Sequence, residues 1–593
     1  MSIEEKIEVR DGMRIHWDAA IRADDGLILR ADVFRPLDEG RYPVILTYGP
    51  YGKGLAFQEG NKAAWERLVA AHPDVLEGSS NKYQSWELVD PEKWVPDGYA
   101  VVRVDSRGTG RSPGFLDPWS PRETQDLYDC IEWAASQPWC SGKVGLNGIS
   151  YYAMNAWQVA CLEPPHLTAI CAWEGSGDYY REATRHGGIM SMFMSNWLPR
   201  AVKRVQYGLG ERGPRSAVTG ELVCGPETLP EEELARNRID VDAWILEHRF
   251  DDDAHRGRSP DWSKVKVPFL SAANWGGQGL HTRGNFEGFV NAASNEKWLE
   301  AHGGAHWESF YTAYGERLQK RFFGHFLKGE DTGWDKQPRV LLQVRHAGPN
   351  PSRPGAEHFV ERAENEWPLA RTQWTKLYLD PRDCSLRREV PAAEQRIEYD
   401  ANGPGVMFLT PPLHEELEIT GPVAAKIFLS SQTTDADLFL VLRVFTPDGR
   451  EIVFHGSNDP RTPIGIGWLR ASHRKLDPER SLPYRPYHPH DEAQPLSPGA
   501  PVELEVEIWP TSIVVSRGYR IGLSVRGKDY EYPGAPLSIP GVLYSLTGVG
   551  PFLHNHPKDR PPEIFGGTHT LHFDANRQPY LLLPIIPRET GNA

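Results

Sequence analysis

The feature that most restricts the fold of this chain is an alternation of short apolar segments with helical patterns near its start. Three apolar runs have the length and composition of buried strands, at residues 43–48 (PVILTY), 99–104 (YAVVRV) and 167–173 (LTAICAW). Residues 122–138, between the second and third runs, carry apolar residues at helical spacing. Strands separated by helices indicate a parallel sheet covered on both faces. We therefore predict an α/β domain.

The rest of the 593-residue chain, which is too long for one hydrophobic core, changes character twice. Between about residues 177 and 260 helical patterns replace the strands, and from about residue 340 short alternating runs predict an all-β sandwich. The proline-rich stretch 474–501 predicts a long ordered loop. We expect an α/β domain in two parts (1–176 and 263–340), a helical cap inserted between them (177–262) and a C-terminal β-sandwich (341–593).

The composition argues against several classes of function. Asp plus Glu (80) outnumber Lys plus Arg (65), and a net charge of −15 disfavours a nucleic-acid partner. The sequence begins without a secretory leader and has no run of about 18 apolar residues, so we expect a cytoplasmic protein with no membrane span. The six cysteines are scattered, and residues 251–253 (DDD) are interpreted as a solvated loop, so no metal site is predicted. The oligomeric state stays open, a homodimer included.

The strongest chemical motif is residues 148–150 (GIS), where a predicted strand (143–149) runs into a predicted helix that begins at Tyr151. A sharp strand-to-helix turn lifts the Ser150 hydroxyl above a sheet, which is the arrangement of a nucleophile in the α/β-hydrolase fold. The N–H of Tyr151, at the start of the helix, is then available to stabilise an oxyanion. The common form of this motif has glycine at position 152, and this chain has tyrosine.

Two further loops follow predicted strands. Residues 47–53 (TYGPYGK) occupy the position that usually supplies oxyanion donors in this fold, and the Tyr51 hydroxyl is a candidate donor. Residues 301–307 (AHGGAHW) offer two histidines beyond the last predicted sheet strands. A catalytic histidine follows the nucleophile in the chain order of this fold, so both His306 and His302 are candidates.

These elements, in this order, resemble the family of X-Pro dipeptidyl-peptidases, cocaine esterase and α-amino-acid ester hydrolases. The likeness extends over nearly the whole chain and includes a C-terminal jelly-roll domain. The segments that carry it are 10–12 (RDG), 25–27 (DGL), 31–36 (ADVFRP), 49–51 (GPY), 105–108 (DSRG), 142–145 (GKVG), 148–151 (GISY), 421–423 (GPV), 434–437 (TDAD) and 447–450 (PDGR).

The resemblance implies roles for several residues. Ser150 would attack a carbonyl carbon, and His306 rather than His302 would serve as general base and then as acid. The hydroxyl of Tyr51 and the N–H of Tyr151 would bind the oxyanion. No metal or organic cofactor is implied.

One position departs from the family pattern. The family places an aspartate where this chain has Gly277, and a histidine base without a carboxylate loses control of its tautomer. Glu174, directly after the predicted strand 167–173, is a candidate replacement, with Asp178 as a reserve. Two other interpretations stay open: Asn274 or Gln278 orients His306 as a neutral amide, or the protein is catalytically weak.

We therefore expect a serine hydrolase that cleaves a small-molecule carboxylic ester through an acyl-enzyme, with an apolar or aromatic acyl group suggested by the aromatic content. The alternative is an amidase or peptidase of the X-Pro dipeptidyl-peptidase or β-lactam acylase type, in which Glu174 or Asp178 would bind a substrate ammonium group. A binding protein without catalytic activity on the same scaffold is the alternative from a different class.

Overall fold

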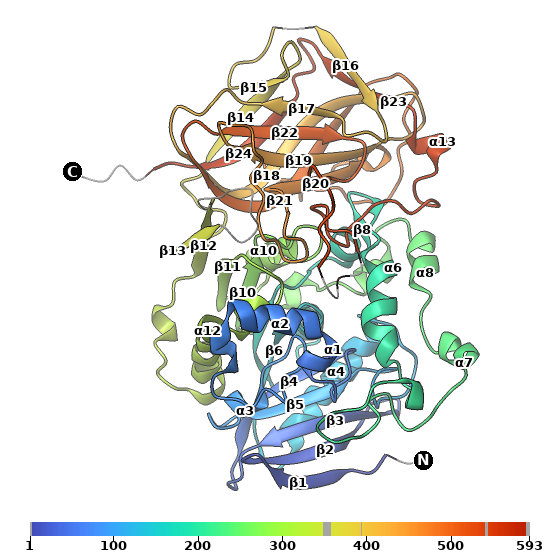
Figure 1. Ribbon diagram of the computed structural model, residues 1–593, viewed down its shortest axis with the longest axis vertical. Coiled ribbons are helices and arrows are strands. Elements are labelled where there is room, and N and C mark those ends of the chain that lie inside the picture. Colours follow the sequence, from blue (N-terminus) through green and yellow to red (C-terminus); the bar gives the residue numbers. More distant parts are fainter. Residues whose placement is uncertain (1–2, 348–356, 393, 540–541, 543, 589–593) are drawn as a thin grey trace, which may run out of the picture.

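The computed structural model describes residues 3–347, 357–392, 394–539, 542 and 544–588 (Figure 1). The first half of the chain forms one sheet in the order β1-β2-β3-β5-β4-β6-β7-β10-β11. Neighbouring strands are antiparallel from β1 to β5 and parallel from β5 to β11. The strands are β1 (Lys6–Arg10), β2 (Met13–Arg22), β3 (Ile28–Arg35), β4 (Tyr42–Gly49), β5 (Ala100–Asp105), β6 (Cys140–Ile149), β7 (Leu167–Trp173), β10 (Phe269–Asn274) and β11 (Lys297–His302).

Helices cover both faces of this sheet, because successive side chains of a strand point to opposite sides. In β4, Val44 and Leu46 belong to a core shared with α4 and α5, whereas Ile45 belongs to a core shared with α2 and α12. The parallel pairing predicted from the sequence is confirmed from β5 to β11, whereas β1, β2 and β3 add an antiparallel part. The strand predicted at residues 167–173 is β7, with the same bounds. The helices of this part are α1 (Phe57–Gly60), α2 (Lys62–Ala71), α3 (Pro91–Trp94), α4 (Pro121–Ser136), α5 (Tyr151–Ala160), α10 (Thr282–Asn291), α11 (Glu308–Tyr311) and α12 (Ala313–Phe323).

Local sequence explains where α4 begins. The Oγ of Ser120 accepts a hydrogen bond from the N–H of Glu123 at 3.3 Å, and Pro121 occupies the first helical position, where no N–H is needed. The apolar residues of α4 at helical spacing, among them Leu127 and Ile131, are buried against the sheet. The helix predicted at residues 122–138 is thus present with its expected face inward.

The chain between β7 and β10 forms a separate layer of short elements beside the sheet (Figure 1). It contains short helices separated by turns and loops, together with a two-strand ladder of β8 and β9 that the sequence pattern did not indicate. Its elements are η2 (Tyr179–Thr184), β8 (Arg185–His186), β9 (Ile189–Met190), α6 (Phe193–Trp197), η3 (Leu198–Val202), η4 (Lys203–Val205), η5 (Gly210–Arg212), α7 (Glu231–Arg236), α8 (Val241–Glu247), α9 (Asp253–Arg256) and η6 (Trp262–Lys264).

The C-terminal part, residues 340–586, is built mostly of strands that surround a core of aliphatic side chains (Figure 1). β18 is central, pairing antiparallel with β21, β23 and β24. The described residues of the 474–501 stretch form a long loop, as predicted. The elements are η7 (Gly324–Lys328) and η8 (Trp334–Lys336) before it, then β12 (Val340–His346), β13 (His358–Glu364), β14 (Gln373–Asp380), β15 (Ser385–Arg387), β16 (Gln395–Asp400), β17 (Val406–Leu409), β18 (Leu417–Ser431), β19 (Asp437–Phe445), β20 (Gly465–Arg470), η9 (Ala471–His473), β21 (Val502–Val515), β22 (Arg520–Arg526), α13 (Pro562–Phe565), β23 (Thr568–Phe573) and β24 (Tyr580–Ile586).

Strand β12 joins the two halves. It pairs parallel with β11 of the first sheet and meets β21 of the C-terminal part at the pair His346–Val514. The buried guanidinium of Arg345 donates to the carbonyl of Ser512 at 2.8 Å and to the Thr511 hydroxyl at 2.8 Å. These contacts hold the C-terminal strands beside the edge of the first sheet.

The parallel strands end at one edge of the sheet, where polar loops follow them. Tyr51 follows β4, Ser150 follows β6, Glu174 follows β7, His281 follows β10 and His306 follows β11. Because ligands of open α/β sheets bind outside the carboxyl ends of the strands, this edge is where a functional site is expected.

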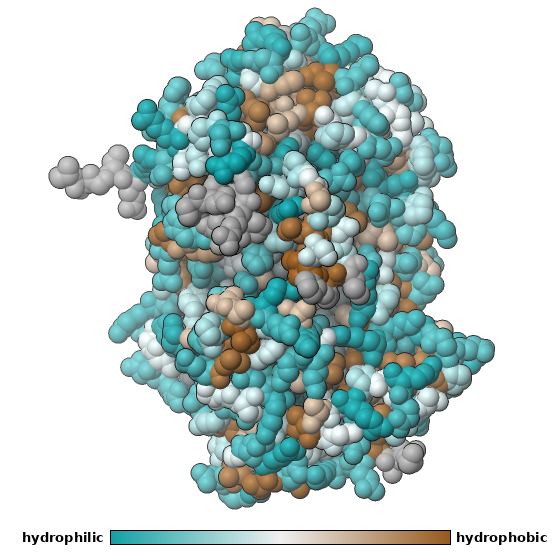
Figure 2. Space-filling model, viewed as in Figure 1, coloured by the Kyte–Doolittle hydropathy of each residue, from teal (hydrophilic) through white to brown (hydrophobic). Residues whose placement is uncertain are grey.

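The molecular surface is consistent with the acidic, polar composition. The face in Figure 2 is mostly hydrophilic, and its apolar side chains form separate small patches. Within the described part of the chain, no helix is both long and apolar enough to cross a bilayer.

The loop that carries Tyr51 is anchored by a buried cation. The Nζ of Lys53 lies 2.7 Å from an Asp18 carboxylate oxygen and 2.6 Å from one of Asp32, and the Lys53 side chain is only 4% exposed. Its N–H also donates to the Asp105 carboxylate at 2.6 Å.

We expect Lys53→Met to destabilise the fold by about 3–5 kcal/mol, because it leaves the buried Asp18 and Asp32 carboxylates without their shared cation. Differential scanning calorimetry should show the first unfolding transition at a lower temperature. The control is Lys62→Met, whose side chain is 75% exposed and 3.8 Å from Glu66, with an expected change within about 0.5 kcal/mol. Equal effects of the two substitutions would contradict an anchoring role for Lys53.

Candidate active site

Ser150 lies in a strained turn between β6 and α5. Its backbone has φ 58° and ψ −108°, a region that side chains other than glycine rarely occupy, and its N–H donates to the carbonyl of Trp173 at 2.9 Å. Gly148 is required here, because a Cβ at this position would lie 2.5 Å from the Cβ of Tyr152. Glycine at 148 thus makes room for the tyrosine that departs from the common motif at position 152.

The hydroxyl of Ser150 pairs with a histidine that the sequence analysis did not single out. Ser150 Oγ lies 3.1 Å from Nε2 of His281, which immediately precedes α10. His281 Nδ1 lies 3.4 Å from Oγ of Ser176, and that hydroxyl donates its own proton to the carbonyl of Leu280 at 2.6 Å. Ser176 is therefore an acceptor for the Nδ1–H of His281, so Nε2 carries the free lone pair that faces Ser150.

His306 lies next to this pair but not in contact with the serine hydroxyl. Its ring stacks on His281 with centroids 5.1 Å apart and planes 12° from parallel. Nδ1 of His306 lies 2.8 Å from Oε2 of Glu174, and Nε2 lies 3.0 Å from Oε1 of Glu87. The structure thus differs from the expected pairing of His306 with Ser150, because both ring nitrogens of His306 face carboxylates.

Both carboxylates influence the protonation of His306. Burial alone disfavours the charged imidazolium, but Glu174 and Glu87 outweigh burial and raise the pKa of His306 to about 10. Burial raises the pKa of Glu87, although His306 acts in the opposite direction. The pKa of His281 lies well below its usual value, first because of burial and then because of the neighbouring His306. At neutral pH the arrangement therefore contains a charged His306 and a neutral His281.

Glu174 is the centre of a hydrogen-bond network. It is 1% exposed and has a positive φ of 47° directly after β7. Besides His306 it accepts from Nδ2 of Asn274 at 3.1 Å and from Oγ of Ser457 at 2.9 Å, and Nε2 of His302 lies 3.5 Å away. Burial opposes ionisation, but the neighbouring His306 and His302 hold the pKa of Glu174 far below its usual range. Glu174 is thus a buried, ionised carboxylate.

The other candidates for orienting His306 have different partners. Asp178 pairs with Arg181 at 2.8 Å, and the amide of Gln278 donates to the carbonyls of Trp275 and Pro510. Asn274 binds Glu174 rather than His306. A Cβ on Gly277 would lie 3.0 Å from the Thr282 hydroxyl at the start of α10. Of the four candidates Glu174, Asp178, Asn274 and Gln278, only Glu174 makes a hydrogen bond with His306 in the structure.

His302, the other histidine considered as a base, contacts the carboxylates of Glu300 and Glu174. Its Nδ1 lies 2.7 Å from Oε2 of Glu300 and its Nε2 lies 3.5 Å from Glu174. Burial disfavours its charged form, but Glu300 and Glu174 raise the pKa of His302 to about 10. Both ring nitrogens therefore face carboxylates, and neither faces Ser150.

The two residues expected to donate to an oxyanion, Tyr51 and Tyr151, pack against each other. The ring of Tyr51 contacts those of Tyr151 and Tyr152 with centroid distances of 6.1 and 6.0 Å. Burial and the nearby Glu87 carboxylate keep the pKa of Tyr51 well above its usual value, so its hydroxyl is a proton donor at neutral pH. Tyr151 begins α5, and the first N–H groups of a helix have no partner within the helix.

The side chains around this site are largely aromatic. Trp119 stacks on Tyr151 with centroids 4.3 Å apart, and Trp197 of the insertion stacks on Trp119 at 5.0 Å. A small cavity of about 20 Å³ lies between Tyr51, Trp86 and Tyr152, among other residues. Ser150 itself is 8% exposed, so the site is almost closed in this structure.

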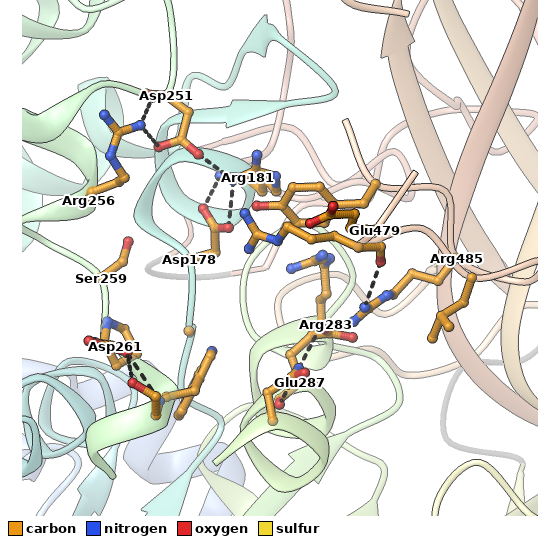
Figure 3. Close-up of a pocket in the computed structure, with 18 residues that line it drawn as sticks. Asp178, Arg181, Asp251, Arg256, Ser259, Asp261, Arg283, Glu287, Glu479 and Arg485 are labelled. Carbon is orange, nitrogen blue, oxygen red and sulfur yellow. Dashed lines mark hydrogen bonds and ion pairs between the residues drawn. The ribbon is translucent and has the colours of Figure 1, made fainter. Parts of the chain in front are cut away.

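A larger cleft of about 810 Å³ lies elsewhere, between the insertion, α10 and the 474–501 loop (Figure 3). Several of its charged side chains pair with one another: Arg181 lies 2.8 Å from Asp178 and 2.7 Å from Asp251, and Arg485 pairs with Glu287. None of Ser150, His281 and His306 lines it. Among the described residues, no group of three or more His, Cys, Asp or Glu side chains is placed to hold a metal ion.

Sequence reasoning missed three residues of this site. His281 lies seven positions after Asn274, on the same loop as Gly277 and Gln278. A histidine on that loop is a sequence feature that could have indicated a site residue. Glu87 and Ser457 carry no local motif. They reach the site from distant segments of the chain, through a loop before β5 and a loop between β19 and β20.

The raised pKa of His306 predicts a pH-dependent contribution to stability. A group whose folded pKa of about 10 exceeds its ordinary value of 6.5 contributes fully below pH 6.5, and the contribution disappears as pH rises through about 10. The unfolding temperature of wild type should therefore exceed that of His306→Gln most at about pH 6 and by progressively less toward pH 10. His414→Gln, at an exposed position, controls for the loss of one histidine. A difference that grows with pH would contradict the assignment.

Two family models match the chain. The model described as X-Pro dipeptidyl-peptidase (S15 family) matches residues 25–308. The model described as X-Pro dipeptidyl-peptidase C-terminal non-catalytic domain matches residues 332–582. The family resemblance inferred from the sequence motifs is confirmed.

Individual relatives match over almost the full length. Cocaine esterase from Rhodococcus sp. is 23% identical over 95% of this chain and 97% of its own. A crystal structure of an α-amino acid ester hydrolase is 15% identical with a TM-score of 0.66, covers 97% of each chain, and shows a shared fold. A CocE/NonD family hydrolase from Staphylococcus aureus is 30% identical with a TM-score of 0.80, and covers 97% of this chain and 94% of that chain. The chain therefore belongs to the CocE/NonD hydrolases, within the family of serine hydrolases that includes cocaine esterase and the X-Pro dipeptidyl-peptidases.

Proposed function

We propose that the protein is a carboxylic ester hydrolase of the α/β-hydrolase fold in which Ser150 forms an acyl-enzyme. The strained backbone of Ser150 at the carboxyl end of a central parallel strand is the observation that carries this proposal. The strand order and the two helical layers agree with an α/β-hydrolase domain, which residues 177–262 interrupt as a cap. The C-terminal strands would form the jelly roll, from about residue 341 onward.

His306 is the proposed general base, and Glu174 is its proposed carboxylate partner. A base that takes the serine proton becomes an imidazolium, and a buried carboxylate on the second ring nitrogen stabilises that charge. Glu174 is 2.8 Å from Nδ1 of His306, whereas the second nitrogen of His281 faces only the neutral hydroxyl of Ser176. Because His306 is charged in the resting site, its Nε2 proton must first pass to Glu87, 3.0 Å away, whose pKa burial raises. The neutral His306 then has a lone pair on Nε2 to accept the proton of Ser150.

His281 is the second candidate for the base, because Ser150 contacts it in the structure at 3.1 Å. Its low pKa makes it neutral at pH 7 and able to accept a proton. The same low pKa makes it a weak base, since a neutral histidine is favoured over the imidazolium by burial.

Oxyanion stabilisation is assigned to the Tyr51 hydroxyl and the N–H of Tyr151. Tyr51 lies in the loop after β4 and Tyr151 is the first residue of α5, so both follow parallel strands at the carboxyl edge of the sheet. Donors held in place before the reaction stabilise developing negative charge without reorganisation. The protonated Tyr51 hydroxyl fits this role.

The aromatic side chains around Ser150 support a small ester with an apolar or aromatic acyl group. A peptidase or amidase acting on a substrate ammonium group is the second candidate function. Neither Glu174 nor Asp178 supports it as the anchor, because each is already paired. Glu87 supports it better: its Oε1 faces His306, but its Oε2 is buried and has no hydrogen-bond partner among the described residues.

We expect wild type to hydrolyse p-nitrophenyl acetate or butyrate and Ser150→Ala to lose the activity. Glu174→Gln should reduce kcat by roughly 10²-fold or more, because the amide stabilises the imidazolium poorly. Alanyl-prolyl-p-nitroanilide, assayed in parallel, tests the peptidase alternative. A wild-type protein that turns over neither substrate and is not labelled by a fluorophosphonate would support a binding protein instead of an enzyme.

Substitution of the two stacked histidines separates the candidate bases. We expect His306→Gln to lower kcat for the ester by about 10³-fold or more, since the proposed base is lost. His281→Gln, which keeps a polar group beside Ser150, should lower kcat by less than about 10-fold. Circular dichroism establishes that both variants are folded. The reverse order of effects would transfer the role of base to His281.

A further inference from the structure

A loop of the C-terminal part, residues 455–463 between β19 and β20, reaches the carboxylate beside His306. Oγ of Ser457 donates to Oε2 of Glu174 at 2.9 Å, and this is the oxygen that also faces Nδ1 of His306. We propose that Ser457 is a positioning residue of the reaction, which acts by orienting Glu174 against His306. This inference rests on the proposed function, and none of the proposed reacting groups comes from the C-terminal part.

Ser457 uses its backbone as well as its side chain at this boundary. Its N–H donates to the carbonyl of Gly276 at 2.9 Å, and its carbonyl accepts from the N–H of His306 at 3.1 Å. The residue is 1% exposed. One serine thus contacts the loop after β10, the backbone of His306 and the carboxylate of Glu174.

The approach of the two loops depends on glycine at both sides. A Cβ on Gly276 would lie 2.4 Å from the Cα of Gly456, far inside the closest contact that carbon atoms adopt. A Cβ on Gly456 would lie 2.1 Å from the Thr462 hydroxyl and 3.0 Å from the carbonyl of Gly276. The absence of side chains here brings the backbone of residue 457 close enough for direct hydrogen bonds.

Hydrogen bonds of Asp459 hold the 455–463 loop in place. The carboxylate of Asp459 accepts from the N–H groups of Gly548 at 2.7 Å and Gly550 at 3.1 Å. The carbonyl of Asp459 accepts from the Thr462 hydroxyl at 2.8 Å and from the N–H of Gly456 at 3.0 Å. A hydroxyl held on such a loop has little freedom, so its hydrogen bond constrains the carboxylate it contacts.

The hydrogen bond has a definable effect on proton transfer. A hydroxyl that donates to Glu174 stabilises the carboxylate and partly neutralises its negative charge. Without that donor the full charge acts on His306, which then holds its proton more tightly. Loss of Ser457 should therefore both misorient Glu174 and move the protonation of His306 to higher pH.

The test is Ser457→Ala in the full-length protein with p-nitrophenyl butyrate. We expect kcat to fall by about 10- to 100-fold, the range for loss of a hydrogen bond to a charged group, with KM within about twofold. The acid limb of the kcat/KM profile should move to higher pH. Ser457→Thr, which keeps the hydroxyl, should restore at least part of kcat.

The matched control is Ser430→Ala, another buried serine of the C-terminal part, whose Oγ lies 2.8 Å from Nε2 of His572. It should leave kcat and the pH profile unchanged. In a Glu174→Gln background, Ser457→Ala should alter kcat by less than about twofold, because the charge it orients is already absent.

Two outcomes would overturn the proposal. If fluorophosphonate labels wild type but Ser457→Ala keeps kcat within about twofold and an unshifted acid limb, the positioning role is wrong while the proposed function stands. An equal loss in Ser430→Ala would likewise assign the effect to general stability of the C-terminal part. If wild type itself is neither labelled nor active, the proposed function fails and this inference fails with it.

Discussion

The buried ion pair between Glu174 and His306 is the interaction on which the rest of the site depends. Taking a carboxylate out of water is costly, and the cost is offset only when charges and hydrogen-bond donors surround it. Glu174 receives such donors from Asn274 at the end of β10, from His306 in the loop after β11 and from Ser457 in the loop between β19 and β20. The hydrogen bonds of Glu174 therefore depend on how the two halves of the molecule are placed relative to each other. A shift of either half would leave this buried charge with fewer hydrogen-bond partners.

The ion pair between Glu174 and His306 is surrounded by further ionisable side chains. A second carboxylate, Glu87, shares the imidazolium of His306, and a second histidine, His302, lies between Glu174 and Glu300. The charges alternate, so each buried ion has a neighbour of opposite sign. The rings of His306 and His281 are stacked with centroids about 5 Å apart, and His306 is charged whereas His281 is neutral. If both were protonated, the two rings would repel each other. Transfer of the Nε2 proton of His306 to Glu87 would change which of the two can accept a proton.

The local sequence pattern was sufficient to predict the strand and the turn that carry Glu174 and Ser150. The strand before Glu174 is predicted residue for residue, because β7 is a short apolar run with β-branched residues, and the turn at Ser150 is marked by its glycine. Three antiparallel strands at the N-terminus and the β8–β9 ladder were not predicted, since their alternation is short or irregular. His281 could have been suspected, because it lies on the loop that follows β10. Glu87 and Ser457 could not be assigned from pattern, because they belong to the site only through proximity to segments distant in sequence, which neither spacing nor composition encodes.

The place of Glu174, the proposed carboxylate partner of His306, follows from the pairing of two neighbouring strands. β7 and β10 are parallel neighbours with Trp173 opposite Ala272, and the N–H of Glu174 donates to the carbonyl of Ala272 at 2.7 Å. A carboxylate at the end of β7 and one in the loop after β10 therefore start from adjacent points on one edge of the sheet. Gly277 has no side chain, and a Cβ there would press on Thr282, whereas the extra methylene of a glutamate at 174 lets its carboxylate reach His306. A carboxylate at the end of β7 thus contacts His306 and also faces residue 457, so a hydroxyl from the C-terminal part donates to it.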